Sequence, residues 1–292
     1  MLLVTGAAGK TGRALIRALA ARGAAVRAMV HRPEQAERLK ALGASEVLAG
    51  DLRDARAVGR AMAGARAVYH ICPNVHPDEV TIGQVAIDAA REAGVDLFVY
   101  HSVLHPQVEA MPHHWRKMRV EERLFASGLD TVILQPAAYQ QNVLGQWTEI
   151  VRDGVYEVPY GLGTRLSMVD LEDVAAVAAR VLTEPGHAGA TYELAGPQPL
   201  AQTEVAAVLG RQFGRRVEAR QVPLEAWAQQ ARAAGLGQYQ VETLLQMFRY
   251  YDRHGFWGNP RVLGHLLGRP PARFEVFVAR AAGALQGGFD AV

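Results

Sequence analysis

The sequence predicts an α/β fold, with a doubly wound parallel sheet and a smaller mixed α/β substrate lobe toward the C-terminus. The first observation is a regular alternation of short apolar runs and helical segments as far as about residue 154. Such alternation is typical of βαβ units, which form parallel sheets. The second observation is that shorter, mixed elements follow that residue. We therefore expect one domain over residues 1–154 and an interleaved lobe over residues 155–292, with a soft boundary.

The stretch MLLVTGAAGKTG at the N-terminus contains an apolar run that breaks into glycines and then enters an alanine-rich helical segment. A strand, a tight turn and a helix in this order form the phosphate-binding start of a Rossmann dinucleotide fold. Backbone N–H groups at a helix N-terminus hold a pyrophosphate only where no Cβ blocks its approach. We therefore predict that a dinucleotide cofactor contacts Gly6, Ala8, Gly9, Lys10, Thr11 and Gly12.

Two alternatives exist for this loop. Gly9, Lys10 and Thr11 look like the end of a Walker A loop, which binds ATP or GTP. That motif needs a glycine five residues before its GK glycine, where Val4 stands, so the sequence disfavours a nucleoside triphosphate. A glycine-rich turn without a ligand also opens some βαβ units, and this alternative stays open.

Composition and charge narrow the class of protein. Hydrophobic residues make up 50% of the 292 residues, enough for a substantial core. A formal net charge of +2 without a Lys/Arg block disfavours nucleic-acid binding. A single cysteine, Cys72, excludes an intrachain disulfide framework. A core strand at the N-terminus and the lack of a long apolar run predict a cytoplasmic protein without a membrane segment.

The end of the second expected strand, residues 25–30, indicates which cofactor the fold prefers. NAD-binding proteins place a carboxylate there, about 20 residues past the glycine loop, which bonds the ribose 2′-hydroxyl and repels a 2′-phosphate. Here the strand is followed by His31 and Arg32. Arginine pairs with phosphate through two parallel hydrogen bonds, so NADP(H) is favoured and NAD stays possible. An ordinary exposed arginine is the alternative interpretation of Arg32.

Further strands are expected over residues 45–49 and 66–71, and helices over residues 33–42, 54–63 and 78–93. Asp51, which follows the third strand, is expected to cap the helix over residues 54–63. His70, Cys72 and His76 lie close together in sequence. A closed metal site needs four ligands at paired spacings, so we expect no metal there.

Ser102 follows the fifth expected strand, residues 96–101, at the edge where open α/β sheets bind their ligands. It is a candidate for contact with the substrate, and a turn-capping serine is the alternative. The next helix is expected over residues 113–127, and a sixth strand over residues 129–135 leads to Pro136. His113 and Lys117 are four residues apart on that helix and so share one of its faces.

Beyond residue 154 we expect strands over residues 165–168, 191–195 and 216–222 and helices over residues 170–182, 201–213, 223–234 and 238–251. Aromatic and methionine side chains concentrate in and after the last of these helices, at Tyr239, Met247, Phe248, Tyr250, Tyr251, Phe256 and Trp257. They form either an apolar lid over a planar substrate such as a quinone or the ordinary packing of the lobe.

Several motifs together resemble one protein family. They are the loop TGAAGKTG, the His-x-x-x-Lys spacing at His113 and Lys117, and Pro136 with Asn142 six residues after it. With the late segment GFWGNPRVLGHLLGRP over residues 255–270, they resemble the NmrA-like group of atypical short-chain dehydrogenases/reductases. The resemblance covers nearly the whole chain and implies an NAD(P)-binding Rossmann protein.

The resemblance also implies roles for residues around the cofactor. An Asp-Leu pair after the third strand contacts the adenine in this superfamily, which here means Asp51 and Leu52. The loop after the fourth strand and the proline after the sixth lie beside the nicotinamide. By that resemblance Cys72, Pro73 and Pro136 are expected there.

The helix with His113 and Lys117 corresponds to the one that carries Tyr-x-x-x-Lys in short-chain dehydrogenases. In that motif the lysine bonds the nicotinamide ribose and the tyrosine passes the proton. Lys117 matches the lysine, whereas His113 replaces the tyrosine, which departs from ordinary alcohol dehydrogenase chemistry. A histidine can act as a general acid near neutral pH, and a solvent-facing residue at the start of a helix is the alternative for His113.

Two functions follow from these residues. The first is an NADPH-dependent reductase of a small quinone or carbonyl compound, in which Lys117 holds the ribose and Ser102 or His113 polarises or protonates the substrate oxygen. The second is a non-catalytic NAD(P)-binding sensor that passes redox state to a protein partner, as regulators in the NmrA-like group do.

Overall fold

The computed structural model describes residues 1–286, and the chain divides into two compact units. Unit 1 comprises Met1–Glu109, His113–Pro136 and Val174–Glu193, and unit 2 comprises Ala110–Pro112, Ala137–Asp173 and the chain from Leu194 onward. Two segments differ from the soft boundary expected at residue 154. Residues 137–154 belong to unit 2, and residues 174–193 belong to unit 1. The reason is that the chain returns to the sheet of unit 1 for one more helix and strand.

Unit 1 is built on a seven-stranded sheet in the order β3-β2-β1-β4-β5-β6-β9. The neighbouring strands from β3 to β6 pair in parallel. The order reverses between β1 and β4, which is the mark of a doubly wound Rossmann sheet, so the predicted fold class is confirmed. The strands are β1 (Leu2–Val4), β2 (Val26–Val30), β3 (Glu46–Ala49), β4 (Ala67–His70), β5 (Leu97–His101), β6 (Thr131–Pro136) and β9 (Thr191–Leu194).

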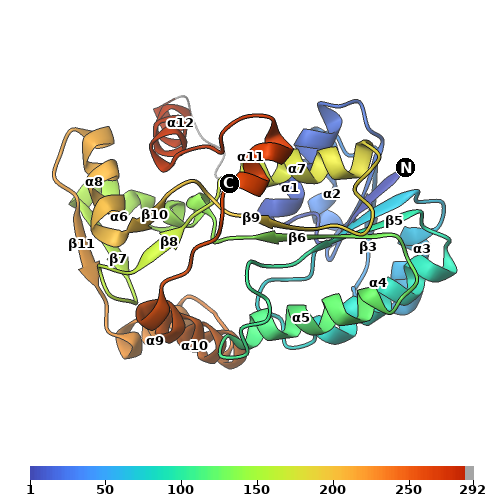
Figure 1. Cartoon of the computed structure of the whole chain (residues 1–292), viewed down its shortest axis with the longest axis horizontal. Helices are drawn as coiled ribbons and strands as arrows, with labels where there is room; N and C mark the ends of the chain where they lie inside the picture. Colours follow the sequence, from blue (N-terminus) through green and yellow to red (C-terminus); the bar gives the residue numbers. More distant parts are fainter. Residues whose placement is uncertain (287–292) are drawn as a thin grey trace. The chain divides into compact units, whose positions relative to one another are not determined.

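Helices cover both faces of this sheet, with α3, α4 and α5 on one face and α1 and α7 on the other (Figure 1). Each expected helix is present to within a few residues. The helices are α1 (Lys10–Ala20), η1 (Pro33–Gln35), α2 (Ala36–Ala41), α3 (Ala55–Met62), α4 (Glu79–Glu92), α5 (Pro112–Phe125) and α7 (Leu171–Thr183).

One capping prediction is wrong. Asp54, and not Asp51, is the N-cap of α3, and its side chain accepts a hydrogen bond from the backbone N–H of Arg56. The carboxylate of Asp51 instead accepts from the backbone N–H of Arg53 at 2.8 Å, so it closes the preceding turn. Two aspartates three residues apart give the same sequence signal, and the backbone path decides which of them caps.

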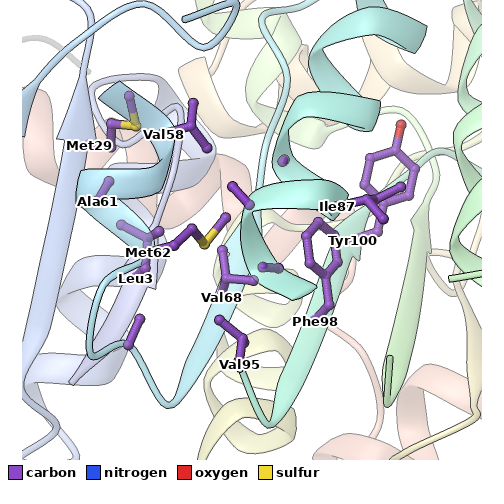
Figure 2. Packing of buried hydrophobic residues seen from close by; sticks show 14 of the residues in the cluster. Leu3, Met29, Val58, Ala61, Met62, Val68, Ile87, Val95, Phe98 and Tyr100 are labelled. Carbon is purple, nitrogen blue, oxygen red and sulfur yellow. The ribbon is translucent and has the colours of Figure 1, made fainter. Parts of the chain in front are cut away.

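One core cluster of unit 1 lies between the sheet and the helices α3, α4 and α5. Phe98 and Tyr100 of β5 are fully buried in it, and Leu3 and Val68 bring the neighbouring strands into the same cluster. Figure 2 shows these side chains meeting Val58, Met62 and Ile87 from the helices. Apolar residues on both strands and helices therefore specify which faces meet.

Unit 2 contains two small two-stranded sheets, an antiparallel one of β8 and β10 and a parallel one of β7 and β11. This mixture confirms the expected mixed α/β lobe. Its strands are β7 (Val155–Val158), β8 (Arg165–Ser167), β10 (Pro199–Ala201) and β11 (Glu218–Gln221). Its helices are η2 (Gln140–Gln146), α6 (Trp147–Asp153), α8 (Gln202–Phe213), α9 (Leu224–Ala233), α10 (Gln238–His254), α11 (Arg261–Leu267) and α12 (Phe274–Gln286).

The aromatic segment of α10 largely packs within unit 2. Phe248 lies against Trp227 with ring centroids 4.7 Å apart, and Tyr251 stacks on Phe256 at 4.8 Å. Trp257 is the exception in this segment, because 52% of its surface is exposed. Ordinary lobe packing therefore accounts for Phe248, Tyr251 and Phe256.

We predict that Gly12→Ala destabilises the protein by about 1–3 kcal/mol, the range for an overpacked site. An added Cβ at Gly12 would lie 2.6 Å from the Cα and the carbonyl oxygen of Ala7, so α1 would have to move off the loop. Gly59→Ala in α3 is the matched control, because its Cβ would meet no atom within 4 Å. Alanine there should stabilise the helix slightly. Urea unfolding of both variants measures the difference, and equal stabilities would contradict this account.

Candidate functional site

The glycine loop between β1 and α1 contains glycines of two kinds. Gly6 has φ of 58°, and a Cβ there would lie 2.6 Å from the carbonyl oxygen of Ile71, so the fold itself requires glycine. Gly12 is required in the same way by the close approach of Ala7. At Gly9, by contrast, φ is an ordinary −69°, and a Cβ would lie 3.3 Å from the carbonyl oxygen of Gly6 as its nearest neighbour.

Gly9 is exposed and is the N-cap of α1, with no side chain to cap the first turn. That turn also contains no acidic residue. The positive end of the helix is therefore neither capped nor neutralised by a carboxylate of its own. The absence of a side chain at Gly9 leaves room for an anion at this helix end, which fits the predicted pyrophosphate contact.

A cavity of about 280 Å³ lies beside this loop. Three arginines from separate elements line it, namely Arg13 of α1, Arg32 after β2 and Arg38 of α2. Burial together with the charges of Arg38 and Arg17 lowers the pKa of Arg13, which reports a locally positive field. The remaining lining residues are Ala8, Glu34, Gln35 and Leu39. Three cations against one carboxylate make this cavity suited to a phosphate group.

The residues expected near the adenine lie at the ends of β2 and β3. Asp51 forms an ion pair with Arg53 at 2.7 Å, and its hydrogen bonds from Arg53 lower its pKa to about 2. The neighbouring charge of His31 acts in the same direction, so His31 is close to Asp51. Leu52 is partly buried against the core cluster. A contact of Asp51 and Leu52 with adenine stays a prediction.

Lys117 lies on α5 and extends into a buried polar cluster. Its ammonium donates to the Glu79 carboxylate at 3.0 Å and to the backbone carbonyl oxygen of His101 at 3.2 Å. Tyr100 donates to the same carboxylate oxygen at 2.8 Å. The thiol of Cys72 also bonds to Glu79, and burial raises the pKa of that thiol far above its ordinary value. Cys72 is therefore a neutral hydrogen-bond donor and not a reactive thiolate.

Ser102 follows β5 as predicted, but it is buried and its hydroxyl donates to the carboxylate of Glu121. Gln135 donates to both oxygens of that carboxylate at 3.0 Å. Burial raises the pKa of Glu121, although these two donors oppose the shift. A substrate oxygen would have to compete with Glu121 for the Ser102 hydroxyl. The predicted catalytic role of Ser102 would therefore require the loss of its hydrogen bond to Glu121.

His113 lies in the first turn of α5 with its ring edge-on to His114 at 4.4 Å. Burial and the charge of Lys117 lower the pKa of His113 to about 4. The imidazole is therefore neutral at pH 7, and its Nδ1 is buried without a hydrogen-bond partner among residues 1–286. A neutral imidazole is a weak proton donor, which argues against His113 as a direct replacement for the family tyrosine.

The structure brings some predicted residues together and separates others. Ala8 and Arg32 line one cavity, and Cys72 and Lys117 bond to one carboxylate. Pro73 is exposed, whereas Pro136 is buried at the end of β6, where its carbonyl oxygen accepts from Leu104. Several residues that line the cavity or support the buried polar groups were not predicted from the sequence, namely Arg13, Arg38, Glu79, Tyr100, Glu121 and Gln135.

The described part of the chain contains neither a metal-binding group of side chains nor a helix that could span a membrane. Across residues 1–286, the His, Cys, Asp and Glu side chains form no group of three that could hold a metal ion. His70 bonds to Thr5, Cys72 to Glu79, and His76 to the backbone N–H of Asp78, so the three partners differ. In the same described part of the chain, no helix is both long and apolar enough to cross a membrane.

Comparison with known proteins assigns the family. A model of the NmrA-like family matches residues 1–277. The chain belongs to the NmrA-like family. It is 31% identical over 289 residues to the NAD(P)H azoreductase of Xenophilus azovorans, and this match covers 97% of the chain and 99% of the relative.

Solved structures share the fold of this chain. An NADPH-dependent quinone oxidoreductase of Escherichia coli, crystallised with NADPH, superposes with a TM-score of 0.84 at 27% identity. That match covers 97% of this chain and 100% of the other. NmrA itself, a negative transcriptional regulator, matches with a TM-score of 0.78 at 20% identity over 99% and 98% of the two chains. This last likeness shows the fold alone.

The buried His70 should make this NmrA-like chain less stable in acid. His70 is fully buried, and burial lowers its pKa from 6.5 to about 4. Below pH 6.5 the unfolded chain takes up a proton that the folded chain does not, so stability falls as the pH drops toward 4. The loss from this group reaches up to about 3 kcal/mol.

His70→Gln should therefore flatten the pH dependence of stability. Urea unfolding at pH 7.5 and pH 5 measures it, and the difference between the two pH values should be smaller in the variant than in the wild type. His265→Gln, at an exposed position on α11, is the control and should leave that difference unchanged. An unchanged difference in His70→Gln would show that His70 is not the group responsible.

Proposed function

We propose that this chain is an NADPH-dependent reductase that transfers a hydride to a small quinone or carbonyl compound. The observation that carries the proposal is the arginine-lined cavity beside the glycine loop. NADPH differs from NADH only in its 2′-phosphate, and a cavity with Arg13, Arg32 and Arg38 provides the charge that such a phosphate needs. NADPH supplies the hydride when it is bound.

The residues near the glycine loop fit a dinucleotide in a second way. Gly9 needs no strained backbone and packs against little, yet it leaves the N-terminus of α1 open to an anion. The pyrophosphate of NADPH is such an anion. Gly6 and Gly12 hold the loop in the shape that places this helix end.

Lys117 is the residue that we assign to the nicotinamide half of the cofactor. Its ammonium has three N–H donors, and Glu79 and the carbonyl of His101 account for two of them. We assign the third to a ribose hydroxyl or a substrate oxygen. A quinone delocalises the oxyanion that forms on hydride transfer, so a neutral His113 is compatible with its reduction.

The relatives support this assignment. An azoreductase that uses NAD(P)H and the quinone oxidoreductase of Escherichia coli both resemble the chain over more than nine-tenths of its length. The first is named for its use of NAD(P)H, and the second is an NADPH-dependent enzyme named for its action on quinones. We expect the present chain to share the cofactor and the reaction type, with Asp51, Leu52, Cys72, Pro73 and Pro136 at the cofactor as the family resemblance implies.

A non-catalytic sensor of the NAD(P) redox state is the second candidate function. The observation that favours it is that neither candidate proton donor is free to act as one. Ser102 donates to Glu121, and the imidazole of His113 is neutral at pH 7. A sensor would bind NADP(H) and shift between conformations that differ in affinity for a protein partner. Cofactor binding without turnover would support it.

We predict that NADPH binds at least tenfold more tightly than NADH, about 1.4 kcal/mol, and that Arg32→Ala removes most of this difference. Arg38→Ala should reduce it as well, because both side chains line the cavity. Arg60→Ala, at an exposed position on α3, is the matched control. Isothermal titration calorimetry of each variant with both cofactors measures the effect. Equal affinities for the two cofactors in the wild type would contradict the assignment of NADPH.

A second experiment tests the reaction. The purified protein should oxidise NADPH in the presence of a naphthoquinone, followed as the loss of absorbance at the nicotinamide band. Lys117→Met should lower kcat/KM by at least about tenfold, because it removes the cation assigned to the ribose and the substrate. Lys40→Met, in an exposed ion pair with Glu37, should have no effect. The absence of turnover across a panel of quinones and carbonyl compounds would exclude the reductase.

A further inference from the structure

Glu79 is an unusual residue for the interior of this fold. It lies in the first turn of α4, only 4% of its side chain is exposed, and it sits 3.0 Å from the ammonium of Lys117. We propose that Glu79 is a positioning residue, which holds the Lys117 ammonium where the cofactor and the substrate meet it. The inference rests on the proposed function, because it assigns a purpose to the contact between Lys117 and NADPH.

The Glu79 carboxylate is charged although it is buried. Burial alone would raise its pKa, but the charge of Lys117 and the hydrogen bonds from Lys117, Tyr100 and Cys72 outweigh burial and lower it. The pair is therefore a buried ion pair with additional donors, the arrangement in which such pairs are tolerated. Loss of either partner leaves an uncompensated charge in the interior.

Rigid elements hold Glu79 in place. Tyr100, which donates to it at 2.8 Å, is fully buried on β5, and its ring stacks on His70 of β4 with a centroid distance of 6.1 Å. The Lys117 ammonium also lies 5.3 Å from the centroid of the Tyr100 ring, within reach of a cation–π contact. The central strands thus fix the carboxylate, and the carboxylate fixes the ammonium.

The packing of α4 against α5 determines the distance between the Glu79 carboxylate and the Lys117 ammonium. Gly83 is one helical turn after Glu79, and Val120 is one turn after Lys117. A Cβ at Gly83 would lie 2.7 Å from both methyl groups of Val120, so a larger residue at position 83 would force the two helices apart. This close approach lets a glutamate on one helix bond directly to a lysine on the other.

The Lys117 side chain is fixed by Glu79 and is still partly accessible to a ligand. It is 12% exposed, whereas the Glu79 side chain is only 4% exposed. One N–H donor of the ammonium is not used by Glu79 or His101. A long lysine side chain loses much rotamer freedom when it is ordered. Since Glu79 already orders it in the protein, a ligand gains the contact without that loss.

A purely structural ion pair between α4 and α5 is the competing explanation. It predicts that changes at Glu79 alter stability and leave ligand affinity alone. A positioning role predicts that Glu79 acts on the ligand only through Lys117. The effects of the two residues on NADPH affinity should then be non-additive, since either change alone abolishes the same contact.

The experiment is a double-mutant cycle of Glu79→Gln and Lys117→Met, with the dissociation constant of NADPH measured by calorimetry. We expect each single variant to weaken binding by about five- to tenfold and the double variant to bind no more weakly than Lys117→Met. Arg119 and Glu122, an exposed ion pair on α5, are the matched control. Arg119→Met and Glu122→Gln should leave the affinity unchanged.

Folding and function are separated within the same set of proteins. Thermal unfolding shows which variants are folded, and the double variant should be folded because it removes both buried charges together. Unchanged NADPH affinity in a folded Glu79→Gln or Lys117→Met, or additive effects in the double variant, would overturn the positioning role. Turnover of the wild type with quinones is measured independently. Absence of turnover would refute the reductase, and the double-mutant cycle on NADPH affinity would still test the role of Glu79.

In turnover, Glu79→Gln should lower kcat more than it raises KM for the quinone, and it should have little further effect in the Lys117→Met background. A general loss of stability would reduce the amount of active enzyme and leave KM unchanged in every background. A fall in kcat of the same size in both backgrounds would show that Glu79 acts independently of Lys117.

Discussion

The close approach of α1 to the loop that precedes it is the constraint on which the rest of unit 1 depends. Gly12 allows the helix to contact Ala7, and Gly6 allows the loop to contact the end of β4 at Ile71. Together they tie the first helix to the two central strands at the point where the strand order reverses. With these contacts made by glycine backbone, the third glycine, Gly9, presents the helix N-terminus without a side chain.

Burial decides the charges in the interior of unit 1. His70 and His113 are neutral at pH 7 because burial lowers their pKa values to about 4. Glu79 stays charged in the same surroundings because Lys117 and two further donors compensate for the lost water. These two buried histidines are therefore neutral, whereas the buried pair of Glu79 and Lys117 is charged, and that pair carries the cation that we assign to the ligand.

The distribution of charge matters more than its total. A net charge of +2 over the chain gives no sign of an anion site, since 31 basic residues nearly balance 29 acidic ones. The fold nevertheless gathers Arg13, Arg32 and Arg38 around one cavity with a single carboxylate, Glu34, in its wall. Local convergence of side chains from separate elements creates the positive field, and such a field acts on a phosphate even when the whole molecule is nearly neutral.

The sequence alone determined the Rossmann fold and the glycine loop, because apolar periodicity and glycine spacing are local properties. It also indicated Arg32 and Lys117 through their places after a strand and on a helix. Only the tertiary structure decided what these residues contact. Arg38 joins Arg32, Glu79 reaches Lys117 across 38 residues, and Glu121 takes the hydroxyl of Ser102. These pairings depend on how the helices pack against the sheet. The spacing of the partners along the sequence does not indicate which of them will meet.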